Sequence, residues 1–325
     1  MKPGIILGVD GGGSKTHLAL ASSDGRLLAM ESGPGTNLES QKASVISAIL
    51  SGLLERACQK AHVRLRDIAA SCFGLCGVDI AEDISAARNI ISVGMGLAGP
   101  VKIHNDAFIA LFNDGWRARG GVVTVGTGQK WLAVSGEKEF MHDGLVIPGL
   151  KDMVMEELLM EAEGYTKPSG FTRRMFRRLG FHSSADFIRR WRYGASRAYV
   201  RPVSAGSWSR IARVQELLGR EANSGDFVAR SIINRYAARL AEGAAVAVRR
   251  VGASGRGLEV VMSGSVLAGI APLRLAFRRQ LAKTLPGAVA VPARFRPICG
   301  ALVYAAHLAG GDISRNTLAE KALRY

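Results

Sequence analysis

Short apolar runs bounded by turn residues open the chain and predict β-strands. Three such runs occupy residues 4–9, 17–21 and 27–31. Two further strands are predicted at 70–76 and 101–104, and apolar residues at helical spacing predict helices over 40–61 and 81–93. Because strands and helices alternate, this half of the chain predicts an α/β domain.

The second half of the pattern starts near Gly120 with further strands and then becomes helical. Apolar residues recur at helical spacing through 151–251, and 227–251 predicts one long amphipathic helix. A strand is predicted at 258–263 and a helix over 266–282. We therefore expect a second α/β unit that contains a helical insertion.

The turn between the first two predicted strands, Asp10 to Thr16, contains three consecutive glycines followed by Ser, Lys and Thr. Glycines leave the backbone N–H groups open to an anion, and the next three side chains add donors. Asp10 could hold a hydrated Mg²⁺ ion. The alternative is a glycine-rich hairpin turn with an exposed lysine. A P-loop and a dinucleotide fingerprint are excluded because a strand, not a helix, follows the glycines.

Two later glycine sites repeat this device. Gly121 to Gly128 is an apolar strand that enters a Gly-Thr-Gly turn before another strand pattern from Trp131. Two such hairpins facing each other would hold a triphosphate from both sides. Val260 to Ser265 ends a strand and opens a helix pattern, where backbone can approach a nucleotide.

In this order and spacing the segments resemble the BadF/BadG/BcrA/BcrD-type ATPase family, and within it the N-acetylglucosamine and glucosamine kinases of the actin-like ATPase and sugar-kinase superfamily. The matching segments cover nearly the whole chain: Asp10 to Thr16, Gly35 to Asn37, Gly74 to Gly77, Asn105 to Ala107, Gly126 to Gly128, Ser263 to Ser265 and Pro297 to Ala301.

The resemblance implies the α/β class with two actin-like ATPase (ribonuclease H-like) domains, each a mixed sheet flanked by helices, and an active site in the cleft between them. It places 1–116 and a C-terminal helix within 312–325 in the first domain. It places 117–311, with the helical insertion 151–251, in the second.

The resemblance also implies ATP and Mg²⁺ as cofactors and a role for each site residue. Asp10 would position the metal, and the phosphates would be held by Gly12, Gly13, Ser14, Lys15, Thr16, Thr127 and Gly128. Gly264 and Gly300 would border the adenosine, Asn37 and Asp152 would meet the sugar, and Asp106 would be the catalytic base beside the sugar. These roles imply an ATP-dependent kinase acting on a hydroxyl of N-acetylglucosamine, glucosamine or a related monosaccharide.

Asp106 also stands out without the resemblance. It follows the apolar strand 101–104 and begins the helix pattern that runs to Phe112. A carboxylate there could accept a hydroxyl proton during phosphoryl transfer. The alternative is that Asp106 only caps its helix. Nearby Asp114 has no assigned role, and its replacement by Asn is expected to be nearly silent.

The chain departs from the family in one region. Relatives carry a Gly-Asp-Glu-Gly-Ser-type loop that helps to hold the sugar, whereas Gly149 to Met155 retains only Asp152. Gln129 replaces a small residue, and Lys130 adds a charge that could stabilise phosphoryl transfer or be solvated. Two alternatives therefore stay open: a non-catalytic sugar or nucleotide sensor, and a sugar-acid kinase of the 2-keto-3-deoxygalactonate type.

Charge is unevenly distributed along this 325-residue chain, whose formal net charge is +16. Residues 164–256 contain 19 Lys and Arg against 5 Asp and Glu. Such a segment could attract anions, but no nucleic-acid-binding motif is visible and few aromatics are interleaved. We expect a solvated arginine-rich face and no specific nucleic-acid partner.

The remaining features predict a cytoplasmic enzyme. A strand begins within the first residues, which leaves no room for a signal peptide, and no apolar run reaches the roughly 20 residues that cross a membrane. The four cysteines, Cys58, Cys72, Cys76 and Cys299, lack metal-ligand spacing and predict buried thiols. No membrane partner is expected, and a homodimer is left open.

Overall fold

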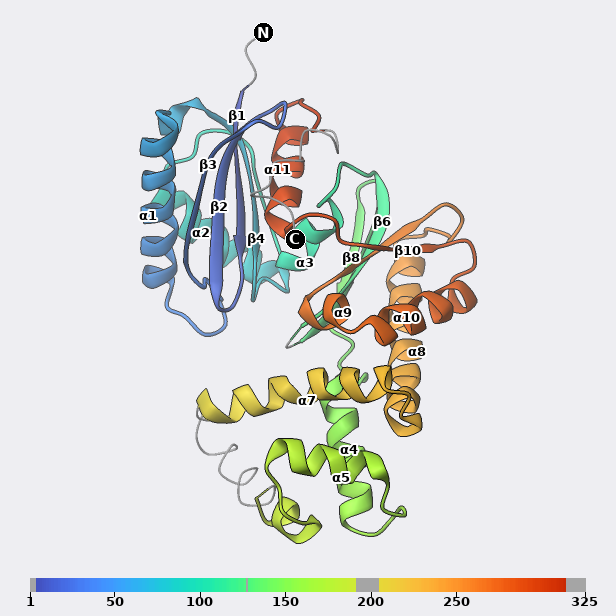
Figure 1. The fold of residues 1–325 in the computed structure, drawn as a ribbon. Coiled ribbons are helices and arrows are strands. Elements are labelled where there is room, and N and C mark those ends of the chain that lie inside the picture. The colour runs from blue at the N-terminus through green and yellow to red at the C-terminus, as the bar shows by residue number, and fades with distance from the viewer. Residues whose placement is uncertain (1–3, 127, 191–204, 314–325) are drawn as a thin grey trace. The chain divides into compact units, whose positions relative to one another are not determined.

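The computed structural model describes residues 4–126, 128–190 and 205–313 (Figure 1). Its mixed α/β fold contains two five-stranded sheets, which confirms the predicted class. The described chain divides into two compact units, 4–122 with 132–141 and 291–313, and 123–131 with 142–290 apart from the gaps. The domain limits from the sequence, 1–116 and 117–311, stay a prediction.

The sheet of the first unit has the strand order β3-β2-β1-β4-β5. Its strands are β1 (Ile5–Gly11), β2 (Lys15–Ser22), β3 (Leu27–Pro34), β4 (Ile68–Leu75) and β5 (Val101–His104). The first three are joined antiparallel, whereas β4 and β5 run parallel to β1. Because β1, β4 and β5 are parallel, their carboxyl ends share one edge of the sheet, where Asp10 and His104 lie.

Helices cover both faces of this sheet (Figure 1). They are α1 (Ala43–Ala61), α2 (Ala81–Met95), α3 (Asp106–Leu111) and α11 (Pro297–Leu308), with a short 3₁₀ turn, η1 (Leu65–Asp67). Helix α1 packs on β2 and β3, whereas α11 packs on β1, β4 and α3. Gly8 lies against Leu302 of α11. Since side chains alternate along a strand, Asp10 lies on the α11 face as well.

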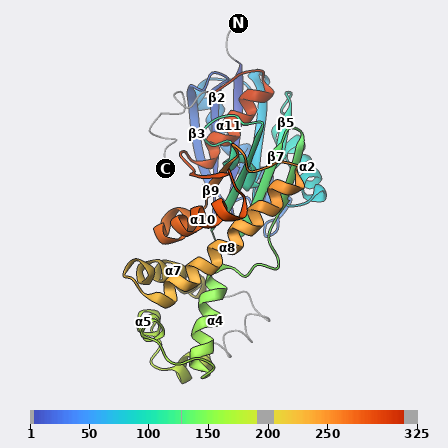
Figure 2. The same ribbon diagram turned by 90° about the vertical axis from the view of Figure 1, so that its right-hand side faces the viewer.

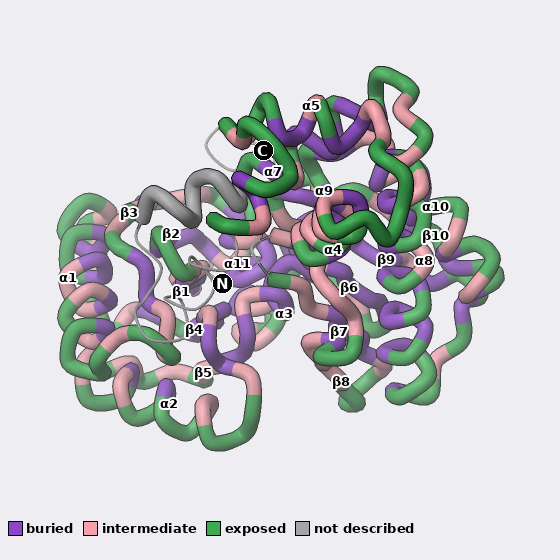
Figure 3. The backbone as a smooth tube through the Cα atoms, turned by 90° about the horizontal axis from the view of Figure 1, so that it is seen from below, coloured by how far each residue is buried: buried purple, intermediate pink, exposed green. Residues whose placement is uncertain are grey.

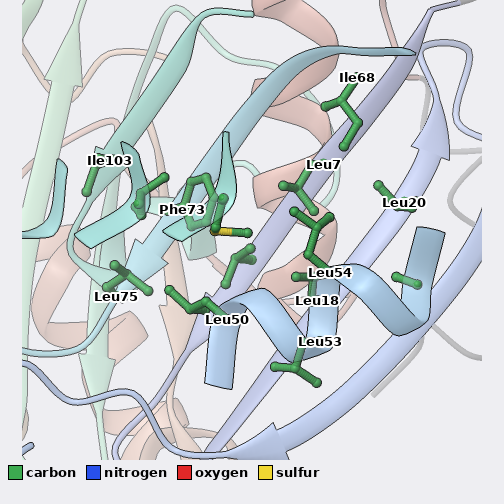
Figure 4. Packing of buried hydrophobic residues seen from close by; sticks show 14 of the residues in the cluster. Leu7, Leu18, Leu20, Leu50, Leu53, Leu54, Ile68, Phe73, Leu75 and Ile103 are labelled. Carbon is green, nitrogen blue, oxygen red and sulfur yellow. The ribbon is translucent and has the colours of Figure 1, made fainter. Parts of the chain in front are cut away.

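The core of the first unit lies between the sheet and α1. Leu7, Leu18 and Leu20 project from the strands toward Leu50 and Leu54 of α1, and all are fully or almost fully buried (Figure 4). Strands β1, β2 and β4 are buried along most of their length, while α1 alternates between buried and exposed positions (Figure 3). This is the 3.6-residue pattern that predicted the helix from sequence.

The second sheet has the strand order β10-β9-β6-β7-β8. Its strands are β6 (Arg119–Val125), β7 (Gln129–Ser135), β8 (Lys138–His142), β9 (Glu259–Ser263) and β10 (Val289–Pro292). The helices after β8 are α4 (Leu150–Ala162), α5 (Gly170–Leu179), α7 (Ala205–Asn223), α8 (Phe227–Arg250), α9 (Ser265–Gly269) and α10 (Ala271–Thr284). Helix α8 packs along α10 and also contacts α4 and α7 (Figure 2).

Two helices differ from the sequence pattern. The helix predicted over 266–282 is interrupted at Ile270, whose backbone is extended, and it restarts as α10 with Pro272 in its first turn. Proline fixes φ and cannot donate an N–H, so it begins a helix more readily than it continues one. The helix predicted within 312–325 lies mostly outside the described residues; α11 is the late helix that packs on the first sheet.

Candidate functional site

The first glycine turn is a tight hairpin, as predicted. Gly11 of β1 is paired with Thr16 of β2, and the Gly12 N–H donates to the carbonyl of Lys15 at 3.0 Å. A Cβ on Gly13 would meet nothing within 4 Å, and Gly13, Ser14 and Lys15 are exposed. The turn therefore offers open space beside its glycine backbone, as an anion cradle requires.

The turn that contains Gly35 and Thr36 packs against this hairpin and supports it. The Thr36 N–H donates to the Gly12 carbonyl at 3.0 Å, and the buried hydroxyls of Thr16 and Thr36 are 3.0 Å apart. Gly35 must be glycine because a Cβ there would collide with the backbone of Gly12 and Gly13. The sequence matched these residues to the family but did not reveal that they support the phosphate turn.

Two carboxylates lie close enough to interact at the edge of the first sheet. Burial, followed by the nearby charge of Asp106, raises the pKa of Asp10 to about 7. Asp10 ends β1 and Asp106 begins α3, so the sheet topology brings together residues that are far apart in sequence. A pair of like charges in a desolvated place favours a cation or a shared proton.

Asp106 is not the cap of its helix. Asn105 is the N-cap, and its Oδ1 accepts from the Ala107 N–H at 2.8 Å. The Asn105 side-chain amide donates to Asp79 at 2.6 Å. The alternative that Asp106 only caps its helix therefore does not hold. Asp79, which sequence reasoning missed, supports the N-cap residue Asn105.

A buried histidine supports the same N-cap. The Asn105 N–H donates to Nδ1 of His104 at 2.8 Å, so the ring proton is on Nε2, which lies 3.3 Å from Glu139. Lys102 is also 3.3 Å from Glu139. The His104 hydrogen bond, followed by the nearby charges, lowers the pKa of Glu139 to about 2. The segment before Asp106 is thus fixed by buried contacts, and none of them has a sequence motif.

Cationic side chains lie beside the first turn. The pKa of His17 is lowered, first by burial and then by Lys15 and Arg296. Both cations are exposed, and Arg296 immediately precedes α11. Positive charge near an open glycine backbone is the environment that a phosphate prefers. Arg296 was missed because the matching segment was assigned from Pro297 onward.

Asn37 directly follows the supporting turn and forms a turn of its own. Its Oδ1 accepts from the Glu39 N–H at 2.9 Å. Gly77, whose φ is +78°, lies against the same Oδ1, because a Cβ there would be 2.6 Å away. Asn37 is therefore fixed beside the Gly74 to Gly77 segment, and its contact with a sugar stays a prediction.

The second glycine turn belongs to the second unit. The Gly126 N–H donates to the Gly128 carbonyl at 2.8 Å, and a Cβ on Gly128 would meet nothing within 4 Å. Thr127 lies outside the described residues. Gly264, with φ +87°, lies against the Val125 backbone, which brings the late glycine site beside this turn.

Gly300 and Asp152 have structural neighbours that the sequence did not indicate. Gly300 is buried, and a Cβ there would collide with the Ile109 carbonyl, so this glycine lets α11 approach α3 closely. Asp152 is exposed and accepts from the Gly149 N–H at 3.1 Å at the start of α4. Their roles toward adenosine and sugar stay predictions.

Two charged side chains near the site form ion pairs. The Lys130 side chain is 20% exposed and pairs with Asp143 at 2.7 Å, whereas a solvated lysine without such a partner was expected. Asp114 is only 4% exposed and pairs with Arg117 at 2.7 Å, so this carboxylate has a structural contact that the sequence did not indicate, and the silent Asn replacement stays an untested prediction. A buried ion pair that loses one partner leaves an uncompensated charge.

Several arginines of the basic segment are held in ion pairs. Arg174 contacts Glu221 at 2.6 Å and Asp226 at 2.5 Å, and Arg178 contacts Glu221 at 2.8 Å. Glu221 is 1% exposed, so these pairs join α5 to α7. Part of the basic excess is therefore structural.

Cys58, Cys72 and Cys299 are buried, and Cys76 is partly buried. Burial raises the pKa of both Cys72 and Cys299 to about 12, so these thiols stay protonated. Within the described ranges, no group of three or more His, Cys, Asp or Glu residues could hold a metal ion. No helix in the described part of the chain is long and apolar enough to cross a membrane.

Comparisons with known proteins agree with the motifs. Residues 7–144 match the BadF/BadG/BcrA/BcrD ATPase family, which confirms the resemblance seen in the sequence. An N-acetylmuramic acid/N-acetylglucosamine kinase of Clostridium acetobutylicum is 34% identical over 124 residues, 38% of this chain. The match spans only 40% of that relative's length.

Two longer matches extend over the remaining chain. An N-acetyl-D-glucosamine kinase of Dictyostelium discoideum is 24% identical over 72% of this chain and 76% of its own. A solved structure from Chromobacterium violaceum, described as a candidate N-acetylglucosamine kinase, has a TM-score of 0.64 and 22% identity, and covers 94% of this chain and 99% of its own. The chain therefore shares the fold of that structure, in agreement with the mixed α/β class that the sequence predicted.

Proposed function

We propose that this protein is an ATP-dependent sugar kinase that transfers the γ-phosphoryl group to a hydroxyl of an amino sugar. The observation that carries the proposal is the pair formed by Asp10 and Asp106 beside an open glycine turn with exposed Lys15. Phosphoryl transfer requires a phosphate cradle, a site for the cation and a positioned base, and this edge of the sheet has a residue for each.

Asp106 acts as the base in this proposal. Asn105, not Asp106, occupies the N-cap, so the Asp106 carboxylate is not needed to begin the helix. Buried contacts of Asn105 with His104 and Asp79 fix the segment that presents it. Asp106 accepts the proton of the sugar hydroxyl as that oxygen attacks phosphorus. The backbone N–H groups and Lys15 hold phosphate oxygens.

The residues fit a Mg²⁺ ion that arrives with the nucleotide. Asp10 has a pKa of about 7, so its ionised form is poorly stabilised until a cation approaches. Asp10 would hold the ion, as carboxylates do in nucleotide sites. When bound, Mg²⁺ neutralises charge on the β- and γ-phosphates. ATP, Mg²⁺ and a cytoplasmic place of action belong to this proposal.

The names of the relatives direct the substrate proposal to N-acetylglucosamine, N-acetylmuramic acid and glucosamine-like sugars. A sensor without turnover is the second candidate, because Gly149 to Met155 lacks the polar loop expected for a sugar. The fixed position of Asp106, which has no structural duty as a cap, favours the enzyme.

A coupled ADP-release assay over N-acetylglucosamine, glucosamine, N-acetylmuramic acid and sugar acids tests the proposal. We expect sugar-dependent ADP release with at least one N-acylated or free hexosamine. Mg-ATP should also raise the melting temperature. Binding of Mg-ATP with no ADP release for any sugar would favour the sensor. No thermal shift and no calorimetric heat with Mg-ATP would refute both the kinase and a nucleotide sensor.

A further inference from the structure

Gln129 and Lys130, the residues after the second glycine turn, both contact the loop between β8 and α4. The Gln129 Nε2 donates to the Ile147 carbonyl at 2.6 Å. Lys130 Nζ lies 2.7 Å from Asp143 at the beginning of this loop. We call residues 143–149 the β8–α4 loop.

Tyr236 of α8 completes the attachment. Its hydroxyl donates to Oε1 of Gln129 at 2.6 Å, and the backbone of Leu150, the first residue of α4, also interacts with this hydroxyl. Tyr236 is 1% exposed, and burial raises the pKa of its hydroxyl, which stays protonated and able to donate. A buried hydroxyl without a partner is unfavourable, so this bond is strongly specified.

Three connections therefore hold the β8–α4 loop at its start, middle and end. Between them, Leu145 and Val146 are 95% and 89% exposed. The loop thus combines an exposed apolar tip with a fixed base. Gln129 has both ends of its amide engaged and directly follows Gly128, so its position determines where the turn ends.

We infer that Gln129 and Tyr236 are positioning residues that fasten the β8–α4 loop to the second glycine turn, so that nucleotide phosphate at the turn and order in the loop stabilise each other. This inference rests on the proposed function for its nucleotide. It adds two residues and one loop for which neither the family match nor the names of the relatives supply a role. Linkage makes the effect reciprocal: a change in the loop weakens nucleotide binding, and bound nucleotide slows hydrogen exchange in the loop.

Calorimetry and hydrogen exchange on Gln129→Met, Tyr236→Phe and the double variant test the inference. Met keeps the length of Gln but cannot make either bond. We expect Gln129→Met to weaken Mg-ATP binding roughly fivefold to thirtyfold and Tyr236→Phe to weaken it about twofold to fivefold. The double variant should bind Mg-ATP no more weakly than Gln129→Met, because Tyr236 acts through Gln129.

The slowing of hydrogen exchange by Mg-ATP supplies a readout that a general loss of stability would not produce. In the parent, Mg-ATP should slow exchange of the amides of residues 144–147 and of Gly149; in Gln129→Met this protection should disappear. Arg235→Gln is the matched control, since it removes a neighbouring α8 contact, the 3.2 Å pair with Glu157, and touches neither turn nor loop. It should leave both readouts unchanged.

Two results overturn the inference. One is Gln129→Met that binds Mg-ATP within twofold of the parent and keeps nucleotide protection of the loop. The other is additive losses in the double variant, which would mean independent contacts. If the parent itself binds no nucleotide, the proposed function fails first, and exchange of the loop in the nucleotide-free protein decides the rest: unchanged exchange in Gln129→Met refutes the fastening, and faster exchange retains it.

Discussion

The two glycine turns of this molecule look alike in sequence and are supported in different ways. The first is supported by backbone: the Thr36 N–H bonds the Gly12 carbonyl, and Gly35 lies against the turn without a side chain. The second is supported by side chains, those of Gln129 and Lys130, which reach the β8–α4 loop. A turn that packs against backbone accepts only residues small enough to fit there. A turn held by side chains can lose these contacts one substitution at a time.

The chemistry beside the two turns differs as well. Asp10 and Asp106 lie in the first unit with its turn, and their mutual repulsion contributes to the raised pKa of Asp10. The charged side chain next to the second turn, Lys130, is already paired with Asp143. In the proposed function, the first turn would therefore serve catalysis and metal binding, and the second would hold phosphate and connect it to a loop.

The largest expected effect is at the first turn. Asp106→Asn keeps the size of the side chain and removes the proton acceptor, so the fold and Mg-ATP affinity should survive while turnover falls roughly 10²–10⁴-fold. Steady-state ADP release with the best sugar, together with calorimetry for Mg-ATP, measures both.

The control for this variant must be a carboxylate without structural duty. Asp114 is unsuitable because it is buried and paired with Arg117. Asp312→Asn is a better match, since Asp312 is exposed and belongs to the same unit. Turnover at the parent rate in a folded, nucleotide-binding Asp106→Asn protein would remove Asp106 from the mechanism.

Glycine replacements separate the two kinds of support. Gly35→Ala places a Cβ against the backbone of Gly12 and Gly13, which cannot move without shifting the hairpin, and should cost about 2–4 kcal/mol of unfolding free energy. Gly128→Ala has open space and should unfold within about 1 kcal/mol of the parent. Urea unfolding of both variants is the measurement, and equal losses would contradict the distinction.

Gly128→Ala also tests whether phosphate occupies the open space beside this glycine. If phosphate occupies the space beside Gly128, the added methyl group of Gly128→Ala should weaken Mg-ATP about tenfold although stability is kept. Gly136→Ala would be a poor control because that glycine has a positive φ. Gly269→Ala, at the end of α9 with open space around it, is the better one. Unchanged affinity in Gly128→Ala would place the phosphate elsewhere.

The pH dependence of stability tests the carboxylate pair. A carboxyl whose pKa rises from 3.8 to about 7 on folding destabilises the fold progressively as pH rises through that window, because the folded state retains a proton that the unfolded state releases. Asp10→Asn removes this penalty. Its melting temperature should exceed that of the parent by a margin that grows from pH 4 to about pH 7 and is constant above it.

Melting curves of the two proteins at several pH values, without nucleotide or Mg²⁺, give this margin directly. A margin independent of pH would mean that Asp10 has an ordinary pKa and that the two carboxylates do not interact. Added Mg-ATP should reverse the order and stabilise the parent more than the variant, since the cation needs the carboxylate.

The sequence predicted most of the fold and the backbone of the site, for identifiable reasons. Strands β1 to β5 and helix α1 follow from local periodicity and turn residues, which need no tertiary information. The glycine turns have a local signature too. Asp79 and Glu139 were missed because each contacts a partner distant in the chain, and no local spacing encodes such a contact.

The same dependence on distant partners explains why the environments of two charged residues were not predicted. Asp114 and Lys130 look like surface residues in a sequence, because nothing near them indicates a partner. Their environments come from packing: Asp114 lies under Arg117 and Arg294, and Lys130 meets the start of the β8–α4 loop. Whether a charge is exposed is a tertiary property, whereas whether a strand alternates is a local one.

The smallest expected effect compares the two lysines that follow the glycine turns. Lys15 is exposed and can reach a phosphate, so Lys15→Met should weaken Mg-ATP about threefold to tenfold, with a loss that shrinks as salt rises. Lys130 is engaged with Asp143, so Lys130→Met should change Mg-ATP affinity by no more than about twofold and lower stability by about 0.5–1 kcal/mol. Calorimetry at two salt concentrations and thermal melting measure these effects. Because both substitutions remove one positive charge from a chain of net charge +16, any difference reflects position and not total charge. An equal loss of affinity for both lysines would mean that the second turn, like the first, presents a cation to the phosphates, and the contrast between the two turns would then be confined to their supports.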